Sequence, residues 1–138
     1  MSTMKYRLAL LGLFSIAAGP LAHATQTNLP GPAGSGRFGT TVTVLSNGNF
    51  VVTDPTYSIP GGATNVGAVY LYNGKTLAVI STLTGSTADD HVGGGGVTVL
   101  NNGNYVVCSP YWANGAATNA GAATFGSCLL YTSDAADE

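Results

Sequence analysis

The densest group of titratable side chains in this sequence is the run Asp89-Asp90-His91. Two carboxylates beside an imidazole could ligate a metal ion or act as an acid–base pair. A metal site needs three or four convergent ligands, however, and no other His or Cys neighbours this run in the sequence. The first copy of an internal repeat has Gly36-Arg37 at the corresponding place, so the repeated unit does not require these side chains. We therefore interpret the run as a solvated turn.

Two other features could carry chemistry, and both have simpler interpretations. Ser109 could form a nucleophile triad with His91 and an Asp, but no G-x-S-x-G elbow surrounds it. Ser109 takes the place of Asp54 in the repeat, which indicates a strand-end cap or turn. The run Gly93–Gly96 could approach a phosphate, but neither a helix nor a P-loop Lys follows it, so we interpret it as a loop or bulge. We expect no catalytic residue, no cofactor and no metal site in this chain.

Three aromatic residues are the candidates for ligand binding. Tyr57, Tyr111 and Trp112 follow the two repeat prolines, in segments predicted to be loops. Loops on a rigid scaffold often carry function, and aromatics beside Asn and Ser suit contacts with a sugar or a protein. The alternative is that these side chains pack between adjacent repeat units.

The elements that would position these residues come from an internal repeat. Val42–Val52 reads VTVLSNGNFVV and Val97–Val107 reads VTVLNNGNYVV, so nine of eleven positions are identical at an offset of 55 residues. The similarity extends through Pro55 and Pro110. A repeat of this length is one supersecondary unit that must stack on neighbours to bury its apolar face. The sequence predicts one complete unit over residues 37–91 and a second, incomplete unit over residues 92–127.

Each unit is predicted to be an antiparallel β-sheet, which makes the fold class all-β. Val- and Thr-rich segments flank Asn47-Gly48, and Asn-Gly favours a type I′ hairpin turn, in which both central residues have positive φ. Pro55 should end the second strand, because proline donates no ladder hydrogen bond. The four predicted strands are Thr40–Leu45, Asn49–Thr53, Gly67–Tyr72 and Thr76–Leu83, with Asn73-Gly74 as the turn between the last two.

This order of motifs resembles the FG-GAP propeller repeats of integrin-α-type proteins, in a form found in bacterial exported repeat proteins. The matching pieces are Phe38-Gly39, the Asn47-Gly48-Asn49 turn, Pro55 and Gly67–Tyr72. The resemblance spans about residues 37–126 and implies a partial β-propeller of four-stranded blades. An open β-solenoid is the alternative. FG-GAP turns often bind calcium through several carboxylates, but the turn Leu45–Asn49 has none, so we do not expect calcium here.

Both ends of the chain are predicted to lie outside the repeat fold. Residues 1–24 are typical of a secretory signal, with Lys5 and Arg7 before an apolar run and Ala22-His23-Ala24 as a small-x-small cleavage site. Residues 25–36 contain Pro30 and Pro32 and are predicted to be a flexible leader. We interpret residues 128–138, CLLYTSDAADE, as a translated sequencing adapter that should pack poorly. The alternatives are an N-terminal anchor helix and a genuine divergent tail.

Composition narrows the function classes further. The segment 25–127 has a net charge near −1. A surface with so little charge has no basic patch that would attract nucleic acid or anionic lipid. Cys108 would be the only cysteine outside the tail, so no disulfide framework is expected, and it should lie in a strand as a buried free thiol.

The sequence thus favours an exported, non-enzymatic bacterial repeat protein that serves as an extracellular binding or scaffold module. Its expected partners are a protein or glycan and further repeat units of its own chain, with no membrane span after signal cleavage. Two alternatives remain open: a non-catalytic platform of a larger secreted enzyme, and a structural surface β-solenoid.

Overall fold

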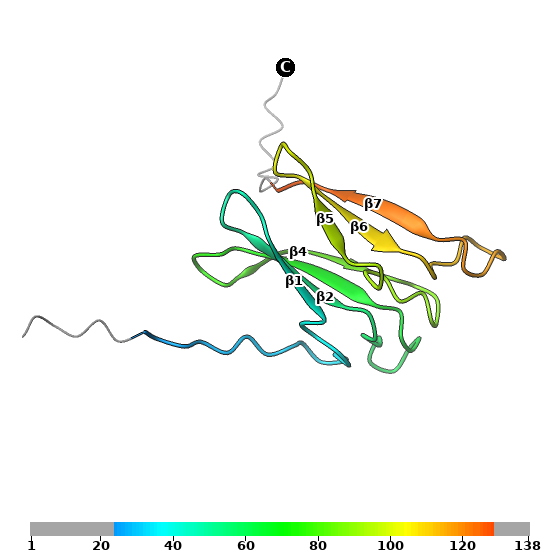
Figure 1. Ribbon diagram of the computed structural model, residues 1–138. Coiled ribbons are helices and arrows are strands. Elements are labelled where there is room, and N and C mark those ends of the chain that lie inside the picture. Colours follow the sequence, from blue (N-terminus) through cyan, green and yellow to red (C-terminus); the bar gives the residue numbers. More distant parts are fainter. Residues whose placement is uncertain (1–23, 129–138) are drawn as a thin grey trace, which may run out of the picture.

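The computed structural model describes residues 24–128, which form two antiparallel sheets and no helix, so none of these residues could cross a membrane as a helix. The first sheet has the order β1-β2-β3-β4 and the second β5-β6-β7. The strands are β1 Thr41–Val44, β2 Phe50–Asp54, β3 Ala68–Tyr72, β4 Val79–Thr84, β5 Val97–Val99, β6 Tyr105–Ser109 and β7 Ala122–Gly126. The predicted all-β fold of antiparallel repeat units is confirmed (Figure 1). Two segments lie outside the described residues. They are residues 1–23, which hold all of the expected signal except Ala24, and residues 129–138.

Residues that are equivalent in the sequence repeat also pair in the same way in the two sheets. In the first sheet Val42 pairs with Val52, and in the second Val97 pairs with Val107. The pairs Ala68↔Asp54 and Ala122↔Ser109 match in the same way. Register is set wherever one face of a strand is buried, because a one-residue slip would turn every side chain to the other face. Both units therefore present equivalent residues to equivalent sides.

The hairpin turns differ from the predicted type I′ geometry. Gly48 has a φ of 84° and Gly103 a φ of 84°, but the preceding asparagines do not have positive φ. The N–H of Gly48 donates to the carbonyl of Leu45, and Leu45 N–H donates to the carbonyl of Asn49. This is a type I turn followed by a left-handed glycine, which is the usual form of a longer hairpin loop. The side chain of Asn47 accepts the N–H of Asn49 and so holds the longer loop.

The fourth strand begins later than predicted, at Val79 instead of Thr76. The side-chain oxygen of Asn73 accepts the N–H groups of both Lys75 and Thr76, which extends the turn. Leu77 then adopts a left-handed φ of 59°, which a strand residue does not have. Local side-chain hydrogen bonds compete with the sheet ladder here, a common role for asparagine.

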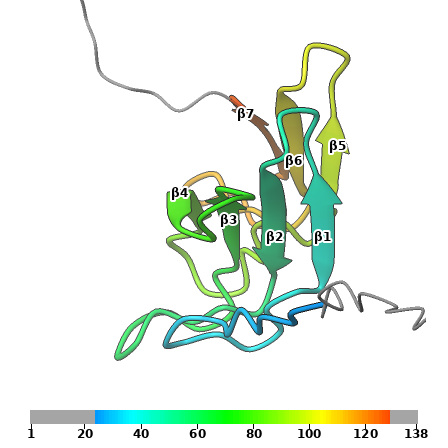
Figure 2. The ribbon, with the colours of Figure 1, turned by 90° about the vertical axis from the view of Figure 1, so that its left-hand side faces the viewer.

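The two sheets stack so that the back of the first unit meets the front of the second. We define the front face by Val52 and its repeat equivalent Val107, and the back face by Val51 and Val106. Figure 2 shows the second sheet lying against the first, with β5 next to β1. The buried residues between the sheets form the interface cluster: Leu45, Val51, Val69, Leu71, Val92, Tyr105, Val107 and Cys128. Burying each large apolar side chain contributes about 1.5–3 kcal/mol, so this cluster holds the units together.

Close contact between the units requires glycine at the linker. Gly93 has a φ of 80°, and a Cβ atom there would lie 2.6 Å from a methyl group of Val69. Any larger residue would push the second unit away from the interface cluster.

The front face of the first unit is covered by the N-terminal segment instead of another sheet. Val52, Ala68, Tyr70 and Tyr72 form the front cluster, against which Leu29 and Phe38 pack. Burial raises the pKa of the Tyr70 hydroxyl well above its ordinary value, and nearby Tyr57 and Asp54 add to the rise.

The end of the expected flexible leader is also hydrogen bonded to this unit. The N–H of Ser58 donates to the carbonyl of Gly34, and the N–H of Gly36 donates to the carboxylate of Asp54. Residues 29–36 therefore act as a cap on the first sheet.

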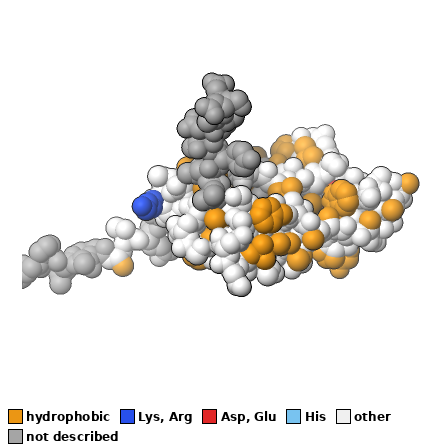
Figure 3. Space-filling model, turned by 90° about the horizontal axis from the view of Figure 1, so that it is seen from above, with side chains coloured by type: hydrophobic (Ala, Val, Ile, Leu, Met, Phe, Trp, Pro, Cys, Tyr) orange, Lys and Arg blue, Asp and Glu red, His pale blue; other side chains and the backbone are white. Residues whose placement is uncertain are grey.

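The back face of the second unit has no such cover among the described residues. Phe125 stands at the repeat position of Leu71, yet Phe125 is 61% exposed and Leu71 is 2% exposed. Figure 3, which views the molecule from above this sheet, shows hydrophobic side chains gathered on the surface. Exposed apolar patches of this kind mark interaction surfaces.

Both cysteines are free, and each departs from expectation. Cys108 lies in β6 as predicted but is only half-buried. The prediction that the tail packs poorly is wrong for Cys128, which is buried in the interface cluster. Its N–H donates to the side chain of Asn104, and its carbonyl accepts the side chain of Asn47. These contacts fix Cys128 between the hairpin turns of both units.

Candidate functional site

The junction between the two units is built around Asp90. Asp90 is 1% exposed, so the interpretation of this run as a solvated turn is wrong for Asp90. One carboxylate oxygen accepts the N–H groups of Ser86 and Thr87, and the other accepts the N–H of Ala113 at 2.9 Å. Burial raises the pKa of Asp90, but the three backbone donors and His91 outweigh burial and hold this pKa below its usual value. Asp90 thus ties the linker to a loop of the second unit.

The neighbours of Asp90 form a surface group that we call the junction site: Asn65, Asp89, His91 and Tyr111. The side-chain amide of Asn65 donates to Asp89 at 3.0 Å, and a His91 ring nitrogen lies 3.9 Å from the same carboxylate. The rings of His91 and Tyr111 meet edge to face, with centroids 5.8 Å apart. The group presents an aromatic ring, a carboxylate and an amide side by side.

The backbone of the junction site is unusual. Asn65, Asp89 and His91 have φ values of 52°, 64° and 45°, all in the left-handed region. Asn, Asp and His adopt this region more readily than other residues with a side chain, but each still costs about 1 kcal/mol or more. Sequence reasoning missed Asn65. Its repeat equivalent Asn119 has a φ of 53°, so the recurring Asn-x-Gly could have marked both positions.

The structure does not gather the three predicted ligand-binding aromatics in one place. Tyr57 is half-buried against the front cluster, and Trp112 is half-buried against the interface cluster. Tyr111 is 53% exposed and belongs to the junction site. Of these three aromatic residues Tyr111 is the most exposed, whereas Trp112 packs on the interface cluster between the units.

Replacing Trp112 by alanine should lower the free energy of unfolding by about 2 kcal/mol or more, somewhat below the loss for a fully buried Trp. Tyr111→Ala is the matched control, because its ring is mostly exposed and its loss should cost under about 0.5 kcal/mol. Urea unfolding of both variants measures the difference. Equal stability of the two variants would contradict an inter-unit packing role for Trp112.

Ser109 has the predicted strand-end role. Its hydroxyl oxygen accepts the N–H of Gly93 at 3.1 Å and is buried. Asp54 does the same in the first unit, where it accepts the N–H of Arg37 at 2.8 Å. His91 is hydrogen bonded through Nδ1 to the carbonyl of Pro55, and no hydrogen bond of the described residues joins His91 to Ser109. The side chains considered for a triad are thus used in structural contacts.

The glycine run is a loop, as one of its two interpretations held, and its last residues pair with β6. Gly95 N–H donates to the carbonyl of Cys108, and Cys108 N–H donates to the carbonyl of Gly96. The run therefore pairs with β6 as the segment before β1 pairs with β2.

Within residues 24–128, no three His, Cys, Asp or Glu side chains come together in a way that could hold a metal ion. In the hairpin turns, the side chains of Asn47 and Asn102 accept backbone N–H groups two residues later. These oxygens are already used within the turns.

Millimolar calcium should consequently leave the melting temperature unchanged. A ligand that binds the folded state raises stability by mass action, and calcium seeks several anionic oxygens that neither hairpin turn offers. Thermal unfolding with calcium, and again with a chelator, tests this expectation. A rise of several degrees that the chelator abolishes would refute it.

The stacked, residue-equivalent sheets define an all-β repeat protein. The chain belongs to the family described as a repeat of unknown function (DUF5650), whose profile matches residues 44–94 and again residues 99–133. The two matches begin with the same 55-residue offset as the sequence repeat. Comparisons with curated proteins and with solved structures found no match.

Proposed function

We propose that this chain is part of an exported bacterial scaffold, in which blade-like β units stack front to back and present loops to an extracellular partner. The observation that supports this function best is the repeated interface. The first unit uses Leu71 on its back face to hold the second unit, and the second unit carries Phe125 at the same position, exposed. A surface that is apolar, repeated and uncovered suits further units of the same type.

The blade-like character rests on the four antiparallel strands of the complete unit and on the resemblance to FG-GAP repeats. The proposed role is non-catalytic. It is supported by the structural use of Ser109, His91 and Asp90, each of which is hydrogen bonded to backbone groups.

Export is proposed from residues 1–24 and can be tested directly. The full chain should be recovered outside the cytoplasm of a bacterial host, with Thr25 at its N-terminus in mass spectrometry. Leu11→Arg and Leu13→Arg together should keep the protein in the cytoplasm, because charge in the apolar run blocks recognition of a signal. Uncleaved protein in the cytoplasm for the unaltered chain would contradict export.

Partner binding is proposed at the junction site, where Tyr111 lies beside His91 and Asp89. An exposed aromatic ring with adjacent polar groups suits a glycan or a protein loop. The full chain should bind a subset of a glycan array, and Tyr111→Ala should abolish that signal without changing stability. Tyr57→Phe is the control, since Tyr57 lies at the front cluster. Equal glycan binding by the Tyr111→Ala and Tyr57→Phe variants would show that the junction site is not the binding site.

A further inference from the structure

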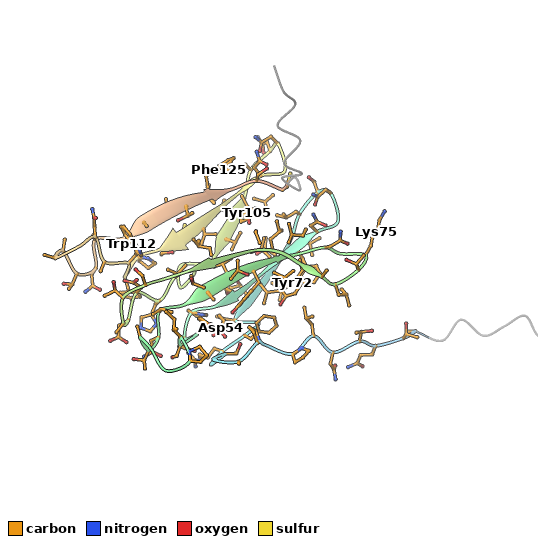
Figure 4. All side chains as sticks on the ribbon, turned by 180° about the vertical axis from the view of Figure 1, so that it is seen from behind. Asp54, Tyr72, Lys75, Tyr105, Trp112 and Phe125 are labelled. Carbon is orange, nitrogen blue, oxygen red and sulfur yellow. The ribbon has the colours of Figure 1, made fainter. Side chains whose placement is uncertain are left out.

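An open cavity with a volume of about 360 Å³ lies between the two sheets. Its walls on the first unit include Ile80 and Leu83 of β4, and its walls on the second include Tyr105, Thr124 and Gly126. Figure 4 shows Tyr105 pointing into the space between the sheets. Burial raises the pKa of Tyr105, and a hydrogen bond with the Ser81 side chain opposes this rise. The cavity thus has both apolar and hydroxyl-bearing walls.

The cavity borders an open edge of the second sheet. Among the described residues β7 has β6 as its one partner. Its equivalent in the first unit, β3, lies in the middle of its sheet between β2 and β4. The outer edge of β7 therefore has no described strand opposite its main-chain donors and acceptors. Such an edge is a ready template for another strand.

We infer that the edge of β7 and the adjoining cavity form an acceptor site for a fourth strand. The occupant is a strand of the β4 sequence type, supplied by another stretch of the same repeat. Adding a strand to an open edge is a common mode of recognition, in which main-chain hydrogen bonds give affinity and side-chain pockets give selectivity. The inference rests on the strand order and the cavity, and does not depend on export or on an extracellular partner.

The register of the first unit shows how the strand would sit. Tyr70 pairs with Thr82, and Ala68 pairs with Thr84. The repeat equivalents of Tyr70 and Ala68 are Thr124 and Ala122. Residues directly opposite each other share a face of the sheet, so Thr82- and Thr84-type residues would point to the cavity side, where Thr124 lies. Small hydroxyl-bearing side chains fit a cavity with walls of mixed polarity.

A synthetic peptide with the sequence of residues 75–85 tests the acceptor site on the full chain. Amide hydrogen exchange over β7 should slow by about tenfold or more at saturating peptide, because newly paired N–H groups are protected. The edge of β1 should be unaffected. A scrambled peptide and a peptide with Thr82→Pro are the controls, since proline removes a ladder donor.

Two variants of the chain locate the binding. Thr124→Tyr would fill the cavity and should weaken peptide binding by about tenfold or more. Ala123→Tyr introduces the same side chain at the preceding position of β7, on the exposed opposite face and outside the cavity walls, and should leave binding unchanged. Circular dichroism establishes that both variants fold.

Three results would overturn the inference. One is unchanged β7 exchange at about 1 mM peptide, where even weak binding would register. Another is protection confined to β1. The third is slowing of β7 exchange to the same extent by the scrambled peptide, which would show that the edge does not select the β4 sequence type.

Discussion

A chain that begins at Ser35 should assemble into larger oligomers as its concentration rises, whereas a chain that begins at Asn28 should keep the mass of the full-length protein. Starting at Ser35 removes Leu29, which packs on the front cluster around Tyr70 and Tyr72. That front face could then pack on the uncovered back face of another copy, around Phe125. Such a contact joins two different surfaces head to tail, so each added copy leaves another contact surface open and assembly continues beyond a dimer.

Sedimentation velocity over a range of concentrations measures this assembly. Adding Phe125→Asp to the chain that begins at Ser35 should restore the smaller species, because a carboxylate would be buried without a partner. If the chain that begins at Ser35 stays at the mass of the Asn28 control, the cap role of residues 29–36 is wrong. If it assembles equally with Phe125→Asp, the back face of the second unit is not the contact.

Asp90→Ala should lower the free energy of unfolding by about 2–4 kcal/mol, because it removes a carboxylate that accepts three partly buried backbone N–H groups. The three donors belong to Ser86, Thr87 and Ala113, and they hold the linker to the second unit. Asp89→Asn is the control at the neighbouring position, because asparagine also tolerates the left-handed φ of this residue. The Asp89 side chain is 69% exposed, and the loss of its charge should cost under about 0.5 kcal/mol. Similar losses for both variants would contradict the central role of Asp90.

The contribution of Asp90 should also depend on pH with a defined sign. The pKa of Asp90 is lowered in the folded protein from the ordinary value of 3.8. Its stabilisation is therefore fully present above pH 3.8 and is lost as the pH falls through the lowered folded-state value. Urea unfolding of the unaltered chain and of Asp90→Asn should differ most near neutral pH and converge in strong acid. A difference that grows toward acid would show that the sign is wrong.

The strands and their pairing could be predicted because their causes are local. Val and Thr alternate around Asn47-Gly48, and the copy around Asn102-Gly103 repeats the pattern. The strand bounds were less predictable where one side chain decided them. Asn73 extends its turn with two hydrogen bonds, and this delayed the fourth strand to Val79. The type I′ turn was wrong for the same kind of reason, since a second loop geometry also accepts Asn-Gly.

The candidate site could be predicted only in part. Tyr111 and Trp112 are adjacent and chemically alike, yet one is exposed beside His91 and the other packs on the interface cluster. Asp89 and Asp90 are identical residues with opposite environments. Residue type alone therefore does not predict which member of each pair is buried.

The sequence by itself determined that this protein is all-β and repetitive, because strand propensity and an exact spacing act along the chain. Only the tertiary structure decided which face each unit turns toward its neighbour. Burial is a property of two surfaces in contact, so it placed Asp90 under the linker, Leu71 inside the interface and Phe125 on the open face. The same stacking left an edge on β7 and a cavity beside it, which the order of residues alone does not reveal.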